Sequence, residues 1–131
     1  MLRTVLVADD DPRARKRTAR VVHACGYSVL TASTPTEIFA AVSACPISVV
    51  LIDHRLIRHC DLRRLLLHAL VVILAHRRAA SVIHNLAVIP KEAVRVALPE
   101  LLKSMIGSPE FRGQRVIVPL RSSTPDDPDP E

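Results

Sequence analysis

Acidic and basic side chains stand directly after short apolar stretches at three places in this sequence. Asp9 and Asp10 follow the first such stretch, Asp53 follows the third, and Lys91 comes shortly after the last. Carboxylates that are brought together repel one another and stay ionised only if a metal cation or a lysine compensates their charge. If the fold gathers these four residues, they form an acidic pocket that suits a hard divalent cation.

The residue types in this pocket favour magnesium and phosphoryl chemistry. Mg²⁺ prefers oxygen ligands and is usually held by one or two carboxylates, waters and phosphate oxygens. We expect Asp10 and Asp53 to be direct ligands and Asp9 to act through water. An aspartate carboxylate can also attack a phosphoryl group and form an aspartyl phosphate. Asp53 is then the nucleophile, while the metal and Lys91 neutralise charge on the transferred group.

The apolar stretches predict an α/β fold. Strands are expected at residues 4–8, 27–32, 47–52, 71–73 and 86–89. Helices are expected at residues 12–25, 35–44, 62–68, 79–84 and 96–106, with the third and fourth shortened and Pro99 in the first turn of the last. The alternation predicts a doubly wound, five-stranded parallel sheet flanked by helices. Ligands of such sheets bind at the carboxyl ends of the strands, where all four pocket residues are expected to lie.

The length of 131 residues fits one domain and a tail. We expect a domain at residues 1–106 and a largely disordered extension at residues 107–131, which is rich in proline and, near its end, in acids. Residues 1–109 hold 15 Lys and Arg against 8 acids, so the expected domain is basic. Without aromatic residues among the basic ones or a DNA-binding motif, we do not expect nucleic-acid binding.

No apolar run reaches the roughly 18 residues of a membrane-spanning helix. We therefore expect a cytoplasmic protein without a membrane partner. The three cysteines, Cys25, Cys45 and Cys60, have unrelated spacings and are expected to be buried free thiols. His54, His59 and Cys60 match no established zinc-site spacing and are expected to lie in a solvated loop.

Two segments of the sequence resemble a known family. VLVADDDP (residues 5–12) and VVLIDHRL (residues 49–56) are similar to the first and third strands of bacterial response-regulator receiver domains. The resemblance runs from about residue 2 to 106 and implies the flavodoxin-like receiver fold. It implies Asp9 and Asp10 as the acidic pair, Asp53 as the phosphorylation site, the backbone carbonyl of Arg55 as a metal ligand, and Lys91 as the phosphate-binding lysine.

The sequence departs from the family at its switch positions. Ala75 stands where the family has Ser or Thr, and Val88 stands where it has an aromatic residue. Lys91 follows a proline, whereas in the family it precedes one. A hydroxyl bonded to a phosphoryl oxygen is worth roughly 1.5 to 3 kcal/mol, and inverting a two-state population needs about 5.5 kcal/mol. We expect Asp53 to remain a competent acceptor while the usual switch relay is absent.

Three functions follow from these residues. The first is a stand-alone, regulatory receiver that takes a phosphoryl group from a histidine kinase or phosphotransfer protein and signals to a downstream protein, with autocatalytic phosphotransfer and dephosphorylation as its only enzymatic chemistry. The second is a pseudo-receiver that acts as a binding or dimerisation module without phosphate. The third is a metal-dependent phosphatase, which is disfavoured because Arg55 stands where such enzymes usually carry a second carboxylate. Each of the three functions is compatible with a homodimer.

Overall fold

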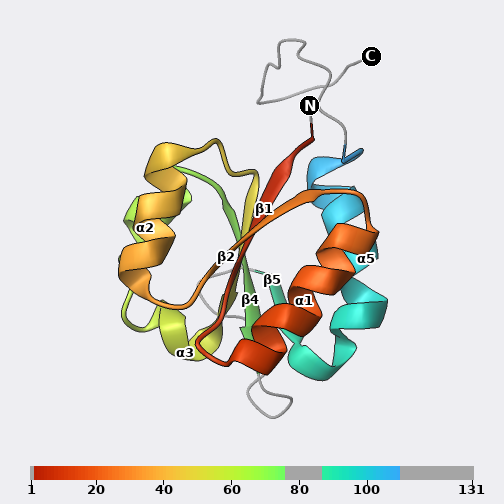
Figure 1. Cartoon of the computed structure of the whole chain (residues 1–131), viewed down its shortest axis with the longest axis horizontal. Helices are drawn as coiled ribbons and strands as arrows, with labels where there is room; N and C mark the ends of the chain where they lie inside the picture. The colour runs from red at the N-terminus through yellow and green to blue at the C-terminus, as the bar shows by residue number, and fades with distance from the viewer. Residues whose placement is uncertain (1, 76–86, 110–131) are drawn as a thin grey trace.

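A computed structural model describes residues 2–75 and 87–109 of the chain. Within these ranges, five parallel strands form one sheet in the order β2-β1-β3-β4-β5 (Figure 1). The strands are β1 (Thr4–Ala8), β2 (Ser28–Ala32), β3 (Val49–Asp53), β4 (Leu70–Ala75) and β5 (Ala87–Pro90). The expected doubly wound, five-stranded parallel sheet is confirmed.

Helices cover both faces of this sheet, with α1 and α5 on one side and α2 and α3 on the other (Figure 1). The helices are α1 (Pro12–Ala24), α2 (Pro35–Ala44), α3 (His54–Ile57), α4 (Leu62–Leu66), the 3₁₀ turn η2 (Lys91–Ala93) and α5 (Val94–Ile106). The helix expected at residues 62–68 corresponds to α4, which begins where expected and ends two residues earlier. The helix expected at residues 79–84 lies outside the described residues.

Alternation along the central strands builds two hydrophobic cores. Val5 and Val7 of β1 pack on the side of α1 and α5, whereas Leu6 and Ala8 pack on the side of α2. β3 divides in the same way, and all five of its residues are buried. A strand that is apolar on both faces is typical of the centre of a parallel sheet. Asp53 therefore ends a strand that both cores hold in place.

Side-chain caps fix where the first two helices begin. The Asp11 carboxylate accepts a hydrogen bond from the Arg13 backbone N–H at the start of α1. The Thr34 hydroxyl accepts one from the Glu37 N–H at the start of α2, and the Glu37 carboxylate accepts from the N–H of Ser33. These caps satisfy N–H groups that have no partner within the helix. Thr34 caps α2 directly before Pro35, its first residue.

The structure corrects the expected loop at His54 only, because His59 and Cys60 follow α3 and lie in neither helix nor strand. Residues His54–Ile57 form the helix α3, which the Asp53 carboxylate caps by accepting a hydrogen bond from the Arg55 N–H. Leu56 of this helix is buried in the same core as α2. Four residues are too few to show helical periodicity in a sequence, so the capping aspartate and one buried leucine were the only signals.

The expected place of Pro99 in the first turn of the last helix is also wrong. Helix α5 begins at Val94, two residues earlier than expected, and Pro99 lies inside it. Val94 is buried against the sheet and draws the helix start toward β5. A proline inside a helix removes a backbone hydrogen bond, but Leu98 and Leu102 are fully buried and hold the helix on both sides of it.

Two further expectations concern the cysteines and the membrane. Cys25, Cys45 and Cys60 are free thiols as expected, but Cys45 is exposed and the other two are only partly buried. Cys45 is exposed because it follows α2 as its C-terminal cap rather than lying on the apolar face of that helix. Among the described residues, no helix has the length and apolar character needed to cross a membrane.

Candidate functional site

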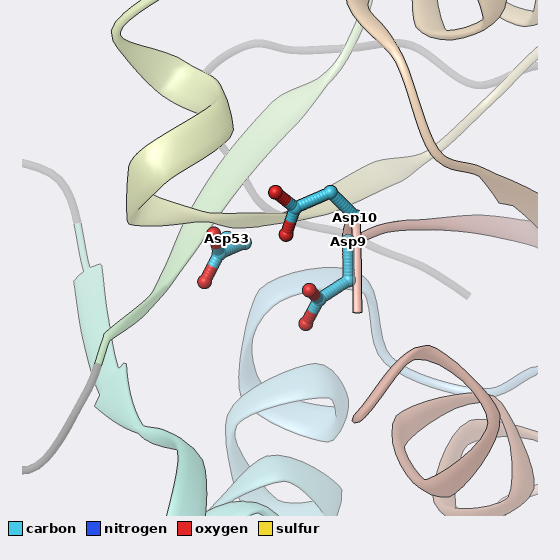
Figure 2. Close-up of side chains that lie close together, drawn as sticks. All are labelled: Asp9, Asp10 and Asp53. Carbon is cyan, nitrogen blue, oxygen red and sulfur yellow. The ribbon is translucent and has the colours of Figure 1, made fainter. Parts of the chain in front are cut away.

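The register of the two central strands brings Asp9 beside Asp53. Ala8 of β1 pairs with Ile52 of β3, so the next residues, Asp9 and Asp53, lie side by side at the same edge of the sheet. Both aspartate side chains are fully buried. Figure 2 shows them with Asp10 at the carboxyl ends of the strands, where ligands of such sheets bind.

Lys91 links the two buried carboxylates. Its Nζ lies 2.9 Å from Asp9 Oδ2 and 2.8 Å from Asp53 Oδ1. Lys91 directly follows β5, and its long side chain reaches past the end of β4 to arrive there. Its own side chain is only 13% exposed, so the three groups form one buried charge cluster. The predicted convergence of residues from β1, β3 and β5 is therefore observed.

A second cation approaches the cluster from the solvent side. The Arg55 guanidinium places Nε 3.3 Å from Asp53 Oδ2 and Nη2 3.7 Å from Asp10 Oδ1. Arg55 and Asp10 are about half exposed, at 46% and 52%. The four predicted pocket residues thus lie together, and the Arg55 side chain joins them.

Backbone groups orient both buried carboxylates. Asp53 Oδ2 accepts a hydrogen bond of 3.1 Å from the Arg55 N–H, and Asp9 Oδ1 accepts one of 3.0 Å from the Asp11 N–H. The backbone carbonyl of Asp9 also accepts a hydrogen bond of 2.9 Å from the Arg15 guanidinium. The chain turns that follow β1 and β3 therefore hold each carboxylate in one orientation.

The charges of the cluster shift the pKa values of its members. Burial alone would raise the pKa of Asp53, but the hydrogen bond and charge of Lys91, together with Arg55, lower it below its usual value. Burial alone would lower the pKa of Lys91, but the hydrogen bonds and charges of Asp53 and Asp9 raise it above its usual value. Asp53 is therefore ionised and Lys91 protonated at neutral pH.

These pKa shifts predict how the stability of the fold depends on pH. The Asp53 contribution is complete above the unfolded-state pKa of about 3.8 and is lost as the pH falls through the lower folded-state value. The Lys91 contribution is complete below about 10.5 and is lost as the pH rises through the higher folded-state value. Urea unfolding across a pH series should show both losses. In Asp53→Asn the acid-side loss should shrink, and an unchanged acid limb would contradict this assignment.

The oxygen atoms of the cluster fit a hard divalent cation. Asp9, Asp10 and Asp53 each offer a carboxylate oxygen, and these atoms all lie within 4.8 Å of one another. Such a donor set is the kind that Mg²⁺ prefers. Arg55, whose backbone carbonyl was predicted as a further ligand, lies two residues past Asp53 in α3. Its role as a ligand, like the roles of the three aspartates, remains a prediction.

Ala75 and Val88, which were predicted to stand at switch positions, lie on neighbouring strands. Ala75 is the last residue of β4 and is fully buried, and Val88 of β5 is partly buried against the core on the α2 side. Ala75 pairs with Pro90, the residue before Lys91. A methyl group thus stands at this strand end, and the end of β4 offers no side-chain hydroxyl there.

Some contacts of the site were missed in the sequence. His54 was assigned to a solvated loop, but its Nδ1 lies 3.9 Å from Asp53 Oδ1 and its side chain is only 18% exposed. Arg15 was not predicted as part of the site, but its guanidinium donates a hydrogen bond to the Asp9 carbonyl beside the cluster. Asp11 as a helix cap, with Arg15 one turn beyond it, was the only signal for the second contact.

Comparison with known proteins identifies the fold. No protein-family model and no curated protein matches the sequence. A structure of the RcsB response regulator of Salmonella typhimurium superposes with a TM-score of 0.66 at 14% identity, over 86% of this chain and 64% of that one. The receiver domain of the PhyR response regulator of Erythrobacter litoralis superposes with a TM-score of 0.57 at 17% identity, over 89% of this chain and 97% of that one.

A de novo designed Rossmann 2x3 fold protein also superposes, with a TM-score of 0.57 at 21% identity over 88% of this chain and all of that one. A designed protein with the same architecture shows that the sheet and helices alone do not carry a function. The chain spans about 64% of the RcsB chain, so what the whole of that protein does does not transfer with the fold. The strand order and these similarities show that the chain has the fold of response-regulator receiver domains.

Proposed function

We propose that the chain is a receiver that accepts a phosphoryl group on Asp53 from a phosphohistidine of a partner histidine kinase or phosphotransfer protein. The observation that carries this proposal is the position of Lys91, whose Nζ lies 2.8 Å from Asp53 and 2.9 Å from Asp9. A designed scaffold with the same fold has no need of a buried lysine between two buried carboxylates. Burying three charged groups is costly, so their presence together favours a function for them.

The proposed reaction forms one bond and breaks another. A carboxylate oxygen of Asp53 attacks phosphorus, the P–N bond to the donor imidazole breaks, and the leaving nitrogen keeps the electron pair and takes up a proton. The Lys91 ammonium lies where it stabilises negative charge on the phosphoryl oxygens. Asp9, Asp10 and Asp53 would hold Mg²⁺, which supplies further positive charge to those oxygens when it is bound.

A basic face of α1 supports a protein partner. Arg13, Lys16, Arg17 and Arg20 are all exposed, and their spacing places them on one side of the helix. This side begins next to the cluster, since α1 follows Asp11 directly. An acidic surface on the helical stem of a kinase would match it in charge, and a downstream protein target would use the same or a neighbouring face.

The second candidate is a pseudo-receiver that binds a partner, or a second copy of itself, without phosphate. Ala75 favours it because the buried end of β4 offers no hydroxyl to a phosphoryl group. The contacts of Arg55 with Asp53 and Asp10 also favour it, because a guanidinium already balances part of the acidic charge. Phosphorylation of Asp53 separates the two candidates.

We expect acetyl phosphate and Mg²⁺ to add one phosphoryl group to the protein. The acyl phosphate bond of the donor breaks as the bond between an Asp53 carboxylate oxygen and phosphorus forms. Intact mass spectrometry would detect the adduct, and Asp53→Asn should not form it. Omitting Mg²⁺ should reduce its yield strongly. An unmodified protein with acetyl phosphate, and with a panel of phosphorylated histidine kinases, would favour the pseudo-receiver.

We also expect phosphorylation to move the ends of β4 and β5 less than in a receiver with a complete switch. Ala75 cannot bond the phosphoryl group, and roughly 1.5 to 3 kcal/mol of switching free energy is therefore missing. Backbone NMR shifts with and without beryllofluoride, a phosphoryl mimic, would measure the change around Ala75 and Val88. Ala75→Thr should enlarge it, and large shifts at both positions in the wild type would contradict the expectation.

A further inference from the structure

We infer that the Arg55 side chain is a built-in competitor of the divalent cation, which holds the cation-binding carboxylates until a metal ion displaces it. This inference rests on the proposed function, because it assumes that the acidic cluster binds a cation. It adds a role for a side chain whose backbone alone was predicted to take part. It also predicts that the affinity for the cation is set by an arginine as well as by the aspartates.

The contacts of Arg55 overlap with those expected for the metal. Its Nε contacts Asp53 Oδ2 at 3.3 Å, and its Nη2 lies 3.7 Å from Asp10 Oδ1. Asp10 and Asp53 are the two carboxylates predicted as direct ligands. Each has an oxygen in the group of carboxylate oxygens that lie within 4.8 Å of one another. One guanidinium thus spans the two groups that a cation would need to approach.

The two cations of the site differ in how easily they leave. Lys91 is 13% exposed and sits between two fully buried carboxylates at hydrogen-bond distance. Arg55 is 46% exposed, and its contact with Asp10 is longer and shared with solvent. Exposed ion pairs contribute little free energy because water and salt screen them. Arg55 is therefore the group that moves when a cation enters, while Lys91 stays in place.

Charge adds to this competition. With three carboxylates and two cationic side chains the cluster carries one net negative charge, and without Arg55 it would carry two. Removing a unit positive charge within a few ångströms of a divalent cation is expected to tighten cation binding on the order of tenfold. In a protein without the Arg55 guanidinium, the three carboxylates bind the metal without first releasing a cationic side chain.

Cation titrations of three purified proteins test the inference. Mn²⁺ binding to the wild type, Arg55→Met and Arg58→Met is measured by electron paramagnetic resonance, with Mg²⁺ as competitor. Methionine keeps an unbranched, flexible side chain but removes the guanidinium and its charge. Arg58 is the matched control, because it is exposed at the C-terminal end of the same short helix and takes no part in the described ion pairs of the cluster.

A second measurement follows the guanidinium itself. The Arg55 Nε–H donates to Asp53 in the structure, so its NMR signal should shift as Mg²⁺ is added to the wild type. The midpoint of this shift should match the Mg²⁺ affinity found by competition. A structural role of Arg55 without competition would leave the signal where it is.

The expected result is about tenfold tighter cation binding in Arg55→Met and little change in Arg58→Met. Equal affinities in all three proteins, or an equal gain in both variants, would overturn the competition. Weaker binding in Arg55→Met would overturn it as well. The proposed function fails separately, if the proteins bind the cation but Asp53 accepts no phosphoryl group.

Discussion

Replacing Lys91 by methionine is expected to lower the unfolding free energy by about 3 kcal/mol at neutral pH. The substitution leaves Asp9 and Asp53 fully buried, with the ammonium that contacts both of them removed. It should also slow phosphoryl transfer to Asp53 on the order of a hundredfold, because a positioned cation is lost from the transition state. Urea unfolding and the rate of phosphorylation by acetyl phosphate measure the two effects.

The pH dependence of the Lys91→Met variant separates lost charge from lost packing. Its deficit in unfolding free energy should shrink as the pH is lowered, because protonation neutralises the unpaired carboxylates. Lys103→Met is the control, since Lys103 is exposed on α5 and its loss should change stability little. A Lys91→Met protein as stable as the wild type at neutral pH would contradict the view that this lysine balances the buried charge.

Replacing Asp10 by alanine is expected to weaken cation binding about a hundredfold while the fold stays intact. Asp10 is 52% exposed, so its loss removes a metal ligand without emptying a buried position. Phosphorylation by acetyl phosphate should fall with the cation affinity. Mn²⁺ titration and urea unfolding of the same protein would measure the two properties side by side.

Asp11→Ala is the matched control for this prediction, because Asp11 is the next residue and has the same charge. Its carboxylate caps α1, so its loss should cost about 1 kcal/mol of stability and leave cation binding nearly unchanged. Asp10→Ala is thus expected to lose cation affinity and keep its stability, whereas Asp11→Ala is expected to lose stability and keep its cation affinity. Equal losses of cation affinity in both would mean that general acidity, and not a ligand at position 10, governs binding.

The elements with clear boundary signals were the ones that the sequence predicted best. β1 and α2 occupy the predicted ranges, because one ends abruptly in acids and the other is bounded by a capping threonine and a proline. The placement of Asp9 beside Asp53 also followed from the pattern, because the carboxyl ends of parallel strands meet at one edge. The predicted strand topology was therefore enough to place the two aspartates together.

The short and the locally determined features could not be predicted in the same way. Helix α3 depends on one capping carboxylate and one buried leucine, and neither gives a periodic signal. The contacts of the Arg55 side chain depend on how α3 turns it back over the strand end, which no spacing in the sequence encodes. Pro99 was misplaced because the helix start is set by the burial of Val94, a tertiary effect.

The central claim is that the carboxylate at the end of β3 is the phosphoryl acceptor. The most direct measurement is to treat the protein with acetyl phosphate and Mg²⁺, reduce acyl phosphates with borohydride, and map the modified residue by peptide mass spectrometry. We expect homoserine at position 53 and at no other acid. Reduction product at Asp9 or Asp10, or a phosphoryl group on His54 in place of Asp53, would contradict it.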